Sequence, residues 1–280
     1  MWVVRASAGS VVRSASKMKS SSKVVCSADA DSPEQCSNKL APSIFGMKFG
    51  RRTIGIIGGM GPGATADLYI KIVREFQTRL NAKYDKDFPP MVIMSVPIPD
   101  HVEKTEDIDK ARDILIEAAQ TAEKAGADLI SIPCNTAHYA WSDIQSAVSI
   151  PVLNMIQETA RYLKEKDLQR VGLLATQATV NFGLYQKELR ALGIRTILPD
   201  EAEMRLVTQS IVDVMAGRAR DQTKRRLEVV MKRLLKKGAQ VIVLGCTELP
   251  LILSNDDPNV IDPTSILARR CFNAIIATAQ

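Results

Sequence analysis

Short apolar runs alternate with stretches of helical periodicity along most of the chain. Residues 53–59 form an apolar run that ends in glycines, and residues 64–80 repeat apolar side chains every three or four positions. The same alternation predicts a strand at 91–96, a helix at 108–125 and a strand at 127–133. This order of strands and helices predicts a parallel sheet covered by helices on both faces.

The pattern starts again in the second half of the chain. Residues 126–134 (Gly-Ala-Asp-Leu-Ile-Ser-Ile-Pro-Cys) match residues 238–246 (Gly-Ala-Gln-Val-Ile-Val-Leu-Gly-Cys), with a cysteine eight residues after the glycine in each. The further elements predicted are strands at 170–176, 196–198 and 239–245 and helices at 179–192, 203–216 and 222–237. The sequence therefore predicts an internal duplication on the scale of a domain.

The predicted fold class is α/β, with two pseudo-symmetric, doubly wound parallel-sheet domains and the active site in the cleft between them. We assign residues 51–156 together with 260–280 to the first domain and residues 157–259 to the second. Ligands of such sheets bind outside the carboxyl ends of the strands. Cys134 and Cys246 both follow a strand, so we expect them on opposite walls of one cleft.

Residues 1–50 are expected to be a transit peptide followed by a disordered linker. Residues 1–28 hold five basic side chains, eight serines and no acid, the composition of an organelle-targeting segment. We expect a plastid destination, with the mitochondrion as the alternative. Five of the six net positive charges of the chain belong to this segment, so the remainder is too weakly charged to suggest a nucleic-acid partner.

The rest of the composition narrows the function classes. No apolar run approaches the roughly 20 residues of a membrane span, which argues against a membrane partner. Five cysteines in 280 residues are too few for a disulfide scaffold, and two histidines leave little room for a histidine-based metal site. We expect no metal, and Cys271 is expected to pack in the last helix.

Two facing thiols suit one kind of chemistry. A thiolate can take a proton from one face of a carbon while a thiol returns one to the other face. A free cysteine has a pKa of about 8.5, so only a few per cent is ionised near pH 7. The residues after each cysteine, Asn135-Thr136 and Thr247-Glu248, can open a helix, but a helix N-terminus contributes only about 0.3–1 kcal/mol to an anion. Neighbouring hydrogen-bond donors and exclusion of water must supply the remaining stabilisation of the thiolate.

The glycine-rich segment 58–63 has three interpretations. It lacks the acidic residue that a dinucleotide fingerprint places about 20 residues further on. Its backbone N–H groups could instead hold a carboxylate. It could also be a tight turn only.

Three motifs together resemble those of the cofactor-independent aspartate/glutamate racemases. They are Gly58-Gly-Met-Gly-Pro62, Pro133-Cys-Asn-Thr-Ala-His138 and Gly245-Cys-Thr-Glu-Leu-Pro250. The resemblance runs from about residue 52 to the C-terminus. It implies an amino-acid racemase that needs no pyridoxal phosphate or other cofactor, acts on a small-molecule amino acid and forms a homodimer.

The same resemblance implies roles for individual residues. Cys134 and Cys246 would be the paired acid and base, and Met60 and neighbouring groups of its loop would line the pocket. Asn135 and Thr136 would donate to the substrate α-carboxylate, with Thr247 as their counterpart in the second half. Glu248 would position or activate the neighbouring thiol, unless it is only a solvated acid at a helix start. His138 would either orient Cys134 or simply pack.

Two positions depart from the aspartate-specific members. These members typically carry an arginine where this chain has His101 and a lysine where it has Glu201. His101 could still contribute if it were protonated, and Lys104 could substitute for the missing cation. A buried Glu201 would repel aspartate. The reaction type is therefore better defined than the substrate, and a racemase of a non-acidic amino acid stays open. So do a related isomerase or decarboxylase of the superfamily and a non-catalytic amino-acid-binding protein.

Overall fold

The first half of the chain forms a three-stranded parallel sheet in the order β2-β1-β3. The computed structural model describes residues 52–99, 107–253 and 257–277. The strands are β1 (Ile54–Gly58), β2 (Met91–Ser95) and β3 (Leu129–Ser131). Every residue of β1 is buried because it is the central strand with helices packed on it, which is why its sequence is apolar without alternation.

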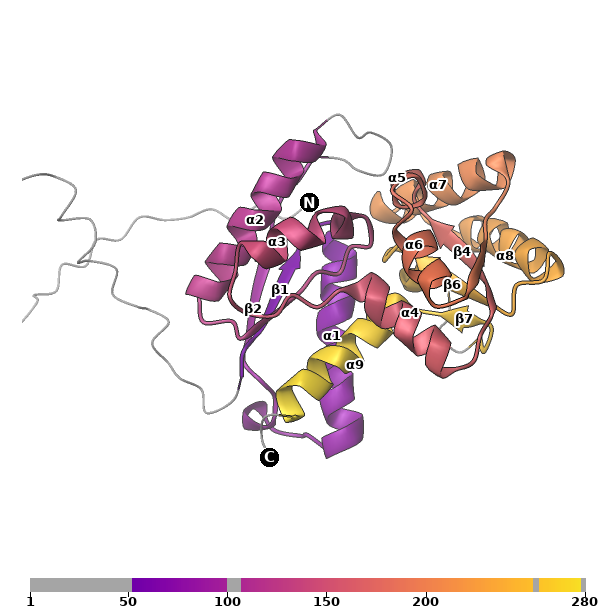
Figure 1. Ribbon diagram of the computed structural model, residues 1–280. Helices are drawn as coiled ribbons and strands as arrows, with labels where there is room; N and C mark the ends of the chain where they lie inside the picture. Colours follow the sequence, from indigo (N-terminus) through magenta and orange to yellow (C-terminus); the bar gives the residue numbers. More distant parts are fainter. Residues whose placement is uncertain (1–51, 100–106, 254–256, 278–280) are drawn as a thin grey trace, which may run out of the picture. The chain divides into compact units, whose positions relative to one another are not determined.

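Two helices of the first half, at 62–80 and 108–124, lie where the apolar periodicity predicts them, and the helix at 141–146 was not predicted (Figure 1). They are α1 (Pro62–Leu80), α2 (Ile108–Lys124) and α3 (Trp141–Ser146), with short 3₁₀ helices η1 (Asp85–Asp87) and η2 (Thr136–Ala140). The buried positions of α2 are spaced three or four apart, as one apolar stripe requires: Ala111, Leu115, Ala118, Ala119 and Ala122.

The second half forms a four-stranded parallel sheet in the order β5-β4-β6-β7. Its strands are β4 (Arg170–Ala175), β5 (Arg195–Ile197), β6 (Val241–Gly245) and β7 (Val260–Ile261). The helices from here to the C-terminus are α4 (Met155–Glu165), α5 (Gln177–Asn181), α6 (Leu184–Ala191), α7 (Glu201–Met215), α8 (Asp221–Lys236), η3 (Leu249–Leu251) and α9 (Pro263–Ile276). The predicted α/β class with parallel sheets is confirmed.

Two local features differ from the prediction. The single helix expected at 179–192 is divided into α5 and α6 at Gly183, whose φ of 65° is left-handed and interrupts the helix. Residues 260–261, expected in the first domain, pair with β6 in the second sheet as β7. The chain therefore returns to the first half after Ile261.

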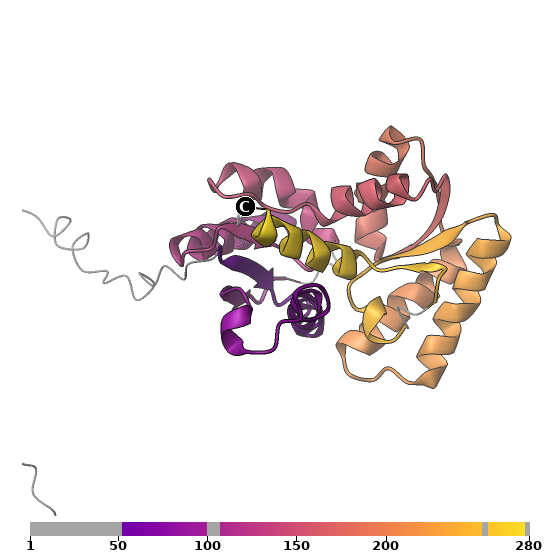
Figure 2. The same cartoon turned by 90° about the horizontal axis from the view of Figure 1, so that it is seen from below.

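Helix α9 makes that return (Figures 1 and 2). In Figure 2 the yellow strand β7 leads into α9, which packs against α1 and α4. Its residues Leu267, Cys271 and Phe272 join Ile54 and Ile56 of β1 in one core cluster. Lys71 of α1 forms a buried ion pair with Asp262, the N-cap residue of α9, at 2.7 Å. No helix in the described ranges has the length and apolarity needed to cross a bilayer.

Candidate active site

A cavity of about 130 Å³ lies where the carboxyl ends of the strands meet. Its lining comes from the residues just after β1, β2, β3, β4 and β6, with one contribution from the end of α7. The lining residues are Gly59, Met60, Gly61, Pro62, Ile98, Pro99, Cys134, Asn135, Thr136, Thr176, Met215, Cys246, Thr247 and Glu248. Both sheets therefore contribute to one pocket, at the end where parallel sheets place their ligands.

Cys134 and Cys246 line this same cavity. Cys134 follows β3 of the first sheet and Cys246 follows β6 of the second, so each half supplies one thiol. Neither cysteine opens an α-helix, contrary to expectation: the turns after them are the 3₁₀ helices η2 and η3. Such short turns carry little dipole, so nearby donors and charges decide the ionisation of the thiols.

Both thiols resist ionisation. Burial raises the pKa of Cys134 to about 12, although the backbone N–H groups of Ala137 and Thr136 act in the opposite direction. Burial raises the pKa of Cys246 well above its ordinary value, and the negative charge of Glu248 adds to the effect. At neutral pH both groups are therefore thiols until a ligand or a proton acceptor changes the balance.

Glu248 is the proton acceptor that the structure places beside Cys246. The Cys246 thiol donates to Glu248 Oε2 at 3.2 Å, and Oε1 accepts a hydrogen bond from the Gly61 N–H at 3.0 Å. Glu248 is only 5% exposed, and burial raises its pKa. A Cβ added at Gly61 would lie 2.8 Å from Oε1, so glycine is what allows this close approach. The glycine segment does hold a carboxylate, and it is the carboxylate of this chain.

Asn135 offers the cavity a free hydrogen-bond donor. Its Oδ1 accepts a hydrogen bond from the Tyr185 hydroxyl at 2.6 Å, which fixes the orientation of the amide. Its Nδ2 is buried and has no hydrogen-bond partner among the described residues. A buried amide donor without a partner costs about 1–3 kcal/mol, which an anionic ligand in the cavity would recover.

The two threonine hydroxyls expected to bind a ligand are already engaged within the protein. The Thr136 hydroxyl lies 3.1 Å from that of Thr176 and 2.8 Å from that of Thr179. The Thr247 hydroxyl donates to the Pro133 carbonyl at 3.1 Å. These contacts join segments of the two halves at the rim of the cavity. Asn135 Nδ2 is therefore the better candidate for a ligand carboxylate.

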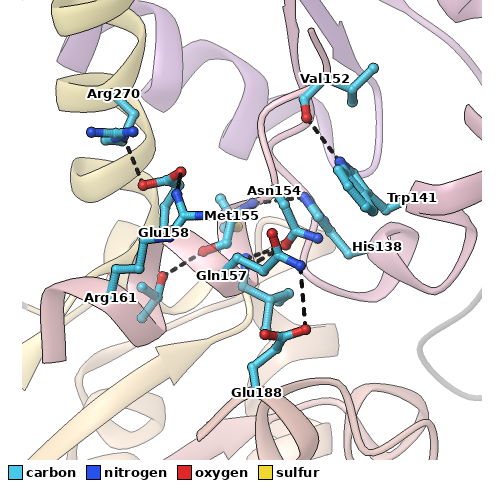
Figure 3. Close-up of polar contacts among 12 residues, drawn as sticks. His138, Trp141, Val152, Asn154, Met155, Gln157, Glu158, Arg161, Glu188 and Arg270 are labelled. Carbon is cyan, nitrogen blue, oxygen red and sulfur yellow. Dashed lines mark hydrogen bonds and ion pairs between the residues drawn. The ribbon is translucent and has the colours of Figure 1, made fainter. Parts of the chain in front are cut away.

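His138 stabilises the turn that follows Cys134 and also contacts the start of α4, where Figure 3 shows it beside Met155. Its Nε2 accepts a hydrogen bond from the Met155 N–H at 3.0 Å, which requires a lone pair on that nitrogen. Its Nδ1 therefore carries the hydrogen and donates to the Cys134 carbonyl at 2.8 Å. Burial lowers the pKa of His138, which favours this neutral form. The imidazole thus orients the backbone of Cys134 through contacts that do not involve its sulfur.

Glu201 is not among the residues that line the cavity. The Glu201 side chain is 91% exposed at the start of α7 and pairs with Arg205 at 2.8 Å. His101 lies outside the described residues, as do residues 1–50 with their expected transit peptide. Cys271 is buried in the core against α1, as predicted.

Four lining residues were not predicted: Ile98, Pro99, Thr176 and Met215. Thr176 directly follows β4, so the rule that sites lie at carboxyl ends of strands could have identified it. Ile98 and Pro99 follow β2 in the same way. Met215 is the last residue of α7, and no local pattern distinguishes it from an ordinary exposed methionine.

Comparisons of the sequence with known proteins identify the family of this chain. The Asp/Glu/Hydantoin racemase family matches residues 57–271. The broad specificity amino-acid racemase RacX of Bacillus subtilis (strain 168) is 30% identical over 226 residues, which cover 80% of this chain and 98% of that protein.

Solved structures show the same relationship. The aspartate racemase of Picrophilus torridus superposes with a TM-score of 0.67 at 32% identity, covering 81% of this chain and 94% of that one. An aspartate racemase homologue from Pyrococcus horikoshii OT3 gives a TM-score of 0.68 at 27% identity, covering 80% and 99%. The chain therefore belongs to the Asp/Glu/Hydantoin racemase family and is an isomerase of the aspartate/glutamate racemase type.

Proposed function

We propose that this protein interconverts the L and D forms of a free amino acid by passing the Cα proton between Cys134 and Cys246. The observation that carries the proposal is that each half of a duplicated fold places one thiol on the wall of the same cavity. Two groups on different walls can reach opposite faces of one carbon, which inversion requires. The unpartnered Asn135 Nδ2 beside Cys134 gives the substrate carboxylate a place to bind.

The proton transfers can be written in balance. Glu248 takes the proton of Cys246, which leaves a thiolate and a carboxylic acid 3.2 Å apart. The thiolate removes the Cα proton of the bound amino acid, and the electron pair of that C–H bond moves into the carboxylate-stabilised carbanion. The Cys134 thiol then donates its proton to the opposite face and becomes the thiolate. Exchange with solvent and with Glu248 restores the starting state, and the other enantiomer runs the same steps in reverse.

The substrate makes the first step easier. A free amino acid carries an ammonium group, and a cation near a buried sulfur lowers its pKa. The pKa values of Cys134 and Cys246 are high because burial disfavours the charged form. Binding of the ammonium group therefore couples thiol ionisation to the presence of substrate.

Single cysteine variants test the proposal. Cys134→Ala and Cys246→Ala should each lower racemisation of a panel of amino acids by about 10²–10⁴-fold, since one of the two faces loses its proton carrier. Cys271→Ala is the matched control because that buried cysteine lies in the α9 core, and its rate should stay near that of the wild type. Retention of racemisation by either cavity variant would contradict the two-thiol mechanism.

Product analysis in the same assay addresses the other functions that the sequence leaves open. Loss of CO₂ or formation of an isomer other than the enantiomer would indicate a different reaction on this scaffold. Thermal stabilisation by an amino acid without turnover would indicate a binding protein. The predicted homodimer can be checked on the same preparation by sedimentation equilibrium.

A further inference from the structure

We infer that the substrate is an amino acid with an uncharged, largely apolar side chain. This inference rests on the proposed racemase function and adds the class of substrate. It comes from the distribution of polar and apolar groups around the cavity, and it identifies Met215 as a residue that determines specificity.

The cavity has chemically different contributions from different elements. The turns after β3 and β6 supply the two thiols, the free amide donor of Asn135 and the carboxyl group of Glu248. The described residues that line the cavity from the segment after β2 and from the end of α7 are apolar, namely Ile98, Pro99 and Met215. With Cα between the sulfurs and the α-carboxylate at Asn135, the surface left for the substrate side chain is these apolar residues together with Thr176, whose hydroxyl already contacts those of Thr136 and Thr179.

Charge argues against a second carboxylate on the substrate. Among the described residues that line the cavity there is no lysine or arginine, and the group that can carry a formal charge beside the thiols is Glu248. A side-chain carboxylate would lose its hydration against Ile98 and Met215 and would also meet the negative charge of Glu248. The described lining therefore offers no cationic partner to a second carboxylate.

Glu248 is also poorly placed to bind a cationic side chain. Its Oε1 accepts from the Gly61 N–H, and its Oε2 accepts from the Cys246 thiol. The Thr247 hydroxyl is also near, 3.4 Å from Oε2. An ammonium or guanidinium group would compete with the contact that the proposed proton transfer uses.

Met215 has the properties of an adaptable apolar wall. It is 49% exposed at the end of α7 and belongs to none of the buried core clusters, so the fold does not need its side chain for packing. Methionine is unbranched and polarisable and adjusts to apolar partners of different shapes. An apolar substrate side chain would cover surface that otherwise faces water.

The test compares kcat/KM across a panel of amino acids, with Cα proton exchange in D₂O as the readout. The panel contains L-methionine, L-leucine, L-alanine, L-aspartate, L-glutamate and L-lysine. We expect L-methionine and L-leucine to exceed L-aspartate, L-glutamate and L-lysine by about 100-fold or more. In Met215→Ala, kcat/KM for L-methionine should fall about 10-fold, mainly through KM, while L-alanine changes less than about twofold because its side chain is too short to need that wall.

Leu206→Ala is the matched control, because Leu206 is an exposed apolar residue of α7 that does not line the cavity. It should leave every substrate unchanged. Fastest exchange with L-aspartate, L-glutamate or L-lysine, or an equal loss for L-methionine and L-alanine in Met215→Ala, would overturn the inference and leave the racemase function standing. Absence of exchange with every amino acid would overturn both.

Discussion

Glu248 links the chemistry of one half to the backbone of the other. One oxygen accepts a hydrogen bond from the Cys246 thiol, and the other accepts one from the N–H of Gly61 in the first half. Burial raises the pKa of Glu248, so this carboxylate is a stronger proton acceptor than an exposed glutamate. At the residue scale, it sets the ease with which Cys246 ionises.

Glu248→Gln should lower kcat by about 100-fold or more while the fold is kept. A glutamine oxygen can still accept from Gly61 but cannot take up the thiol proton. In the wild type, kcat/KM should fall as the pH drops through the raised pKa of Glu248, because the protonated acid cannot accept a proton. The variant should lack that acidic limb. The measurement is the pH profile of kcat/KM for both proteins. If the variant had the wild-type rate and the same fall in kcat/KM at acidic pH, Glu248 would not be the proton acceptor of Cys246.

His138 acts on Cys134 through the backbone. His138→Phe removes the acceptor of the Met155 N–H and the donor to the Cys134 carbonyl, so we expect about 1–3 kcal/mol less stability in urea unfolding and a lower kcat. Trp141→Phe is a neighbouring control that removes the bond from Trp141 Nε1 to the Val152 carbonyl and part of the packed ring, without touching the contacts of His138 (Figure 3). It should lose stability without the loss in kcat. Equal kcat values in the two variants would show that His138 has no part in placing the thiol.

At the scale of elements, Glu203 of α7 forms an ion pair with Lys237 at the end of α8. It accepts a hydrogen bond from the Asp200 N–H at 2.9 Å in a capping box and pairs with Lys237 at 3.0 Å. Burial acts to raise its pKa, but the Asp200 N–H and Lys237 outweigh burial and lower it. Folding therefore favours the ionised form of this carboxyl group.

The stability that Glu203 contributes should depend on pH with a defined sign. A lowered pKa in the folded state means that the contribution is complete above the unfolded-state value, about 4.3, and is lost as the pH falls through the folded-state value. Glu203→Gln should cost about 1 kcal/mol at pH 7 and less at pH 3.5 in urea unfolding. Glu201→Gln, exposed and paired with Arg205, is the control and should stay within about 0.5 kcal/mol. A cost that is the same at both pH values would contradict this account.

The elements themselves were largely predictable because their apolar periodicity is strong. The run at 53–59 became β1, and the stripe on 108–125 became α2 almost to the residue. The interruption at Gly183 and the 3₁₀ turns after the cysteines were not predictable in the same way. They depend on backbone conformation and tertiary contacts, which the hydrophobic pattern does not encode.

At the scale of the whole molecule, the duplication explains why part of the site could be predicted. Equivalent positions in a repeat end up at equivalent ends of their strands, so Cys134 and Cys246 were identifiable from sequence alone. Met215 was not identifiable because it reaches the cavity from the far end of a helix. Likewise, the engagement of the Thr136 and Thr247 hydroxyls follows from contacts between halves.

The N-terminal segment gives a prediction about the whole chain. Residues 1–28 carry five of the six net positive charges and no acid. We expect residues 1–50 fused to a fluorescent protein to direct it to plastids, and replacement of the five basic residues by alanine to abolish this. Microscopy with plastid and mitochondrial markers checks the outcome. A cytosolic fusion would contradict targeting, and a mitochondrial one would select the alternative destination.

Isotope incorporation tests the central claim most directly. A single enantiomer of the best substrate is converted in D₂O to a few per cent, and deuterium at Cα is measured separately in both enantiomers. If one thiol removes the proton and the other donates a solvent-derived deuteron, the newly formed enantiomer carries deuterium and the remaining starting enantiomer carries almost none. Equal deuterium in both enantiomers from the earliest times would mean that one group serves both faces, and the account of two opposed cysteines would be wrong.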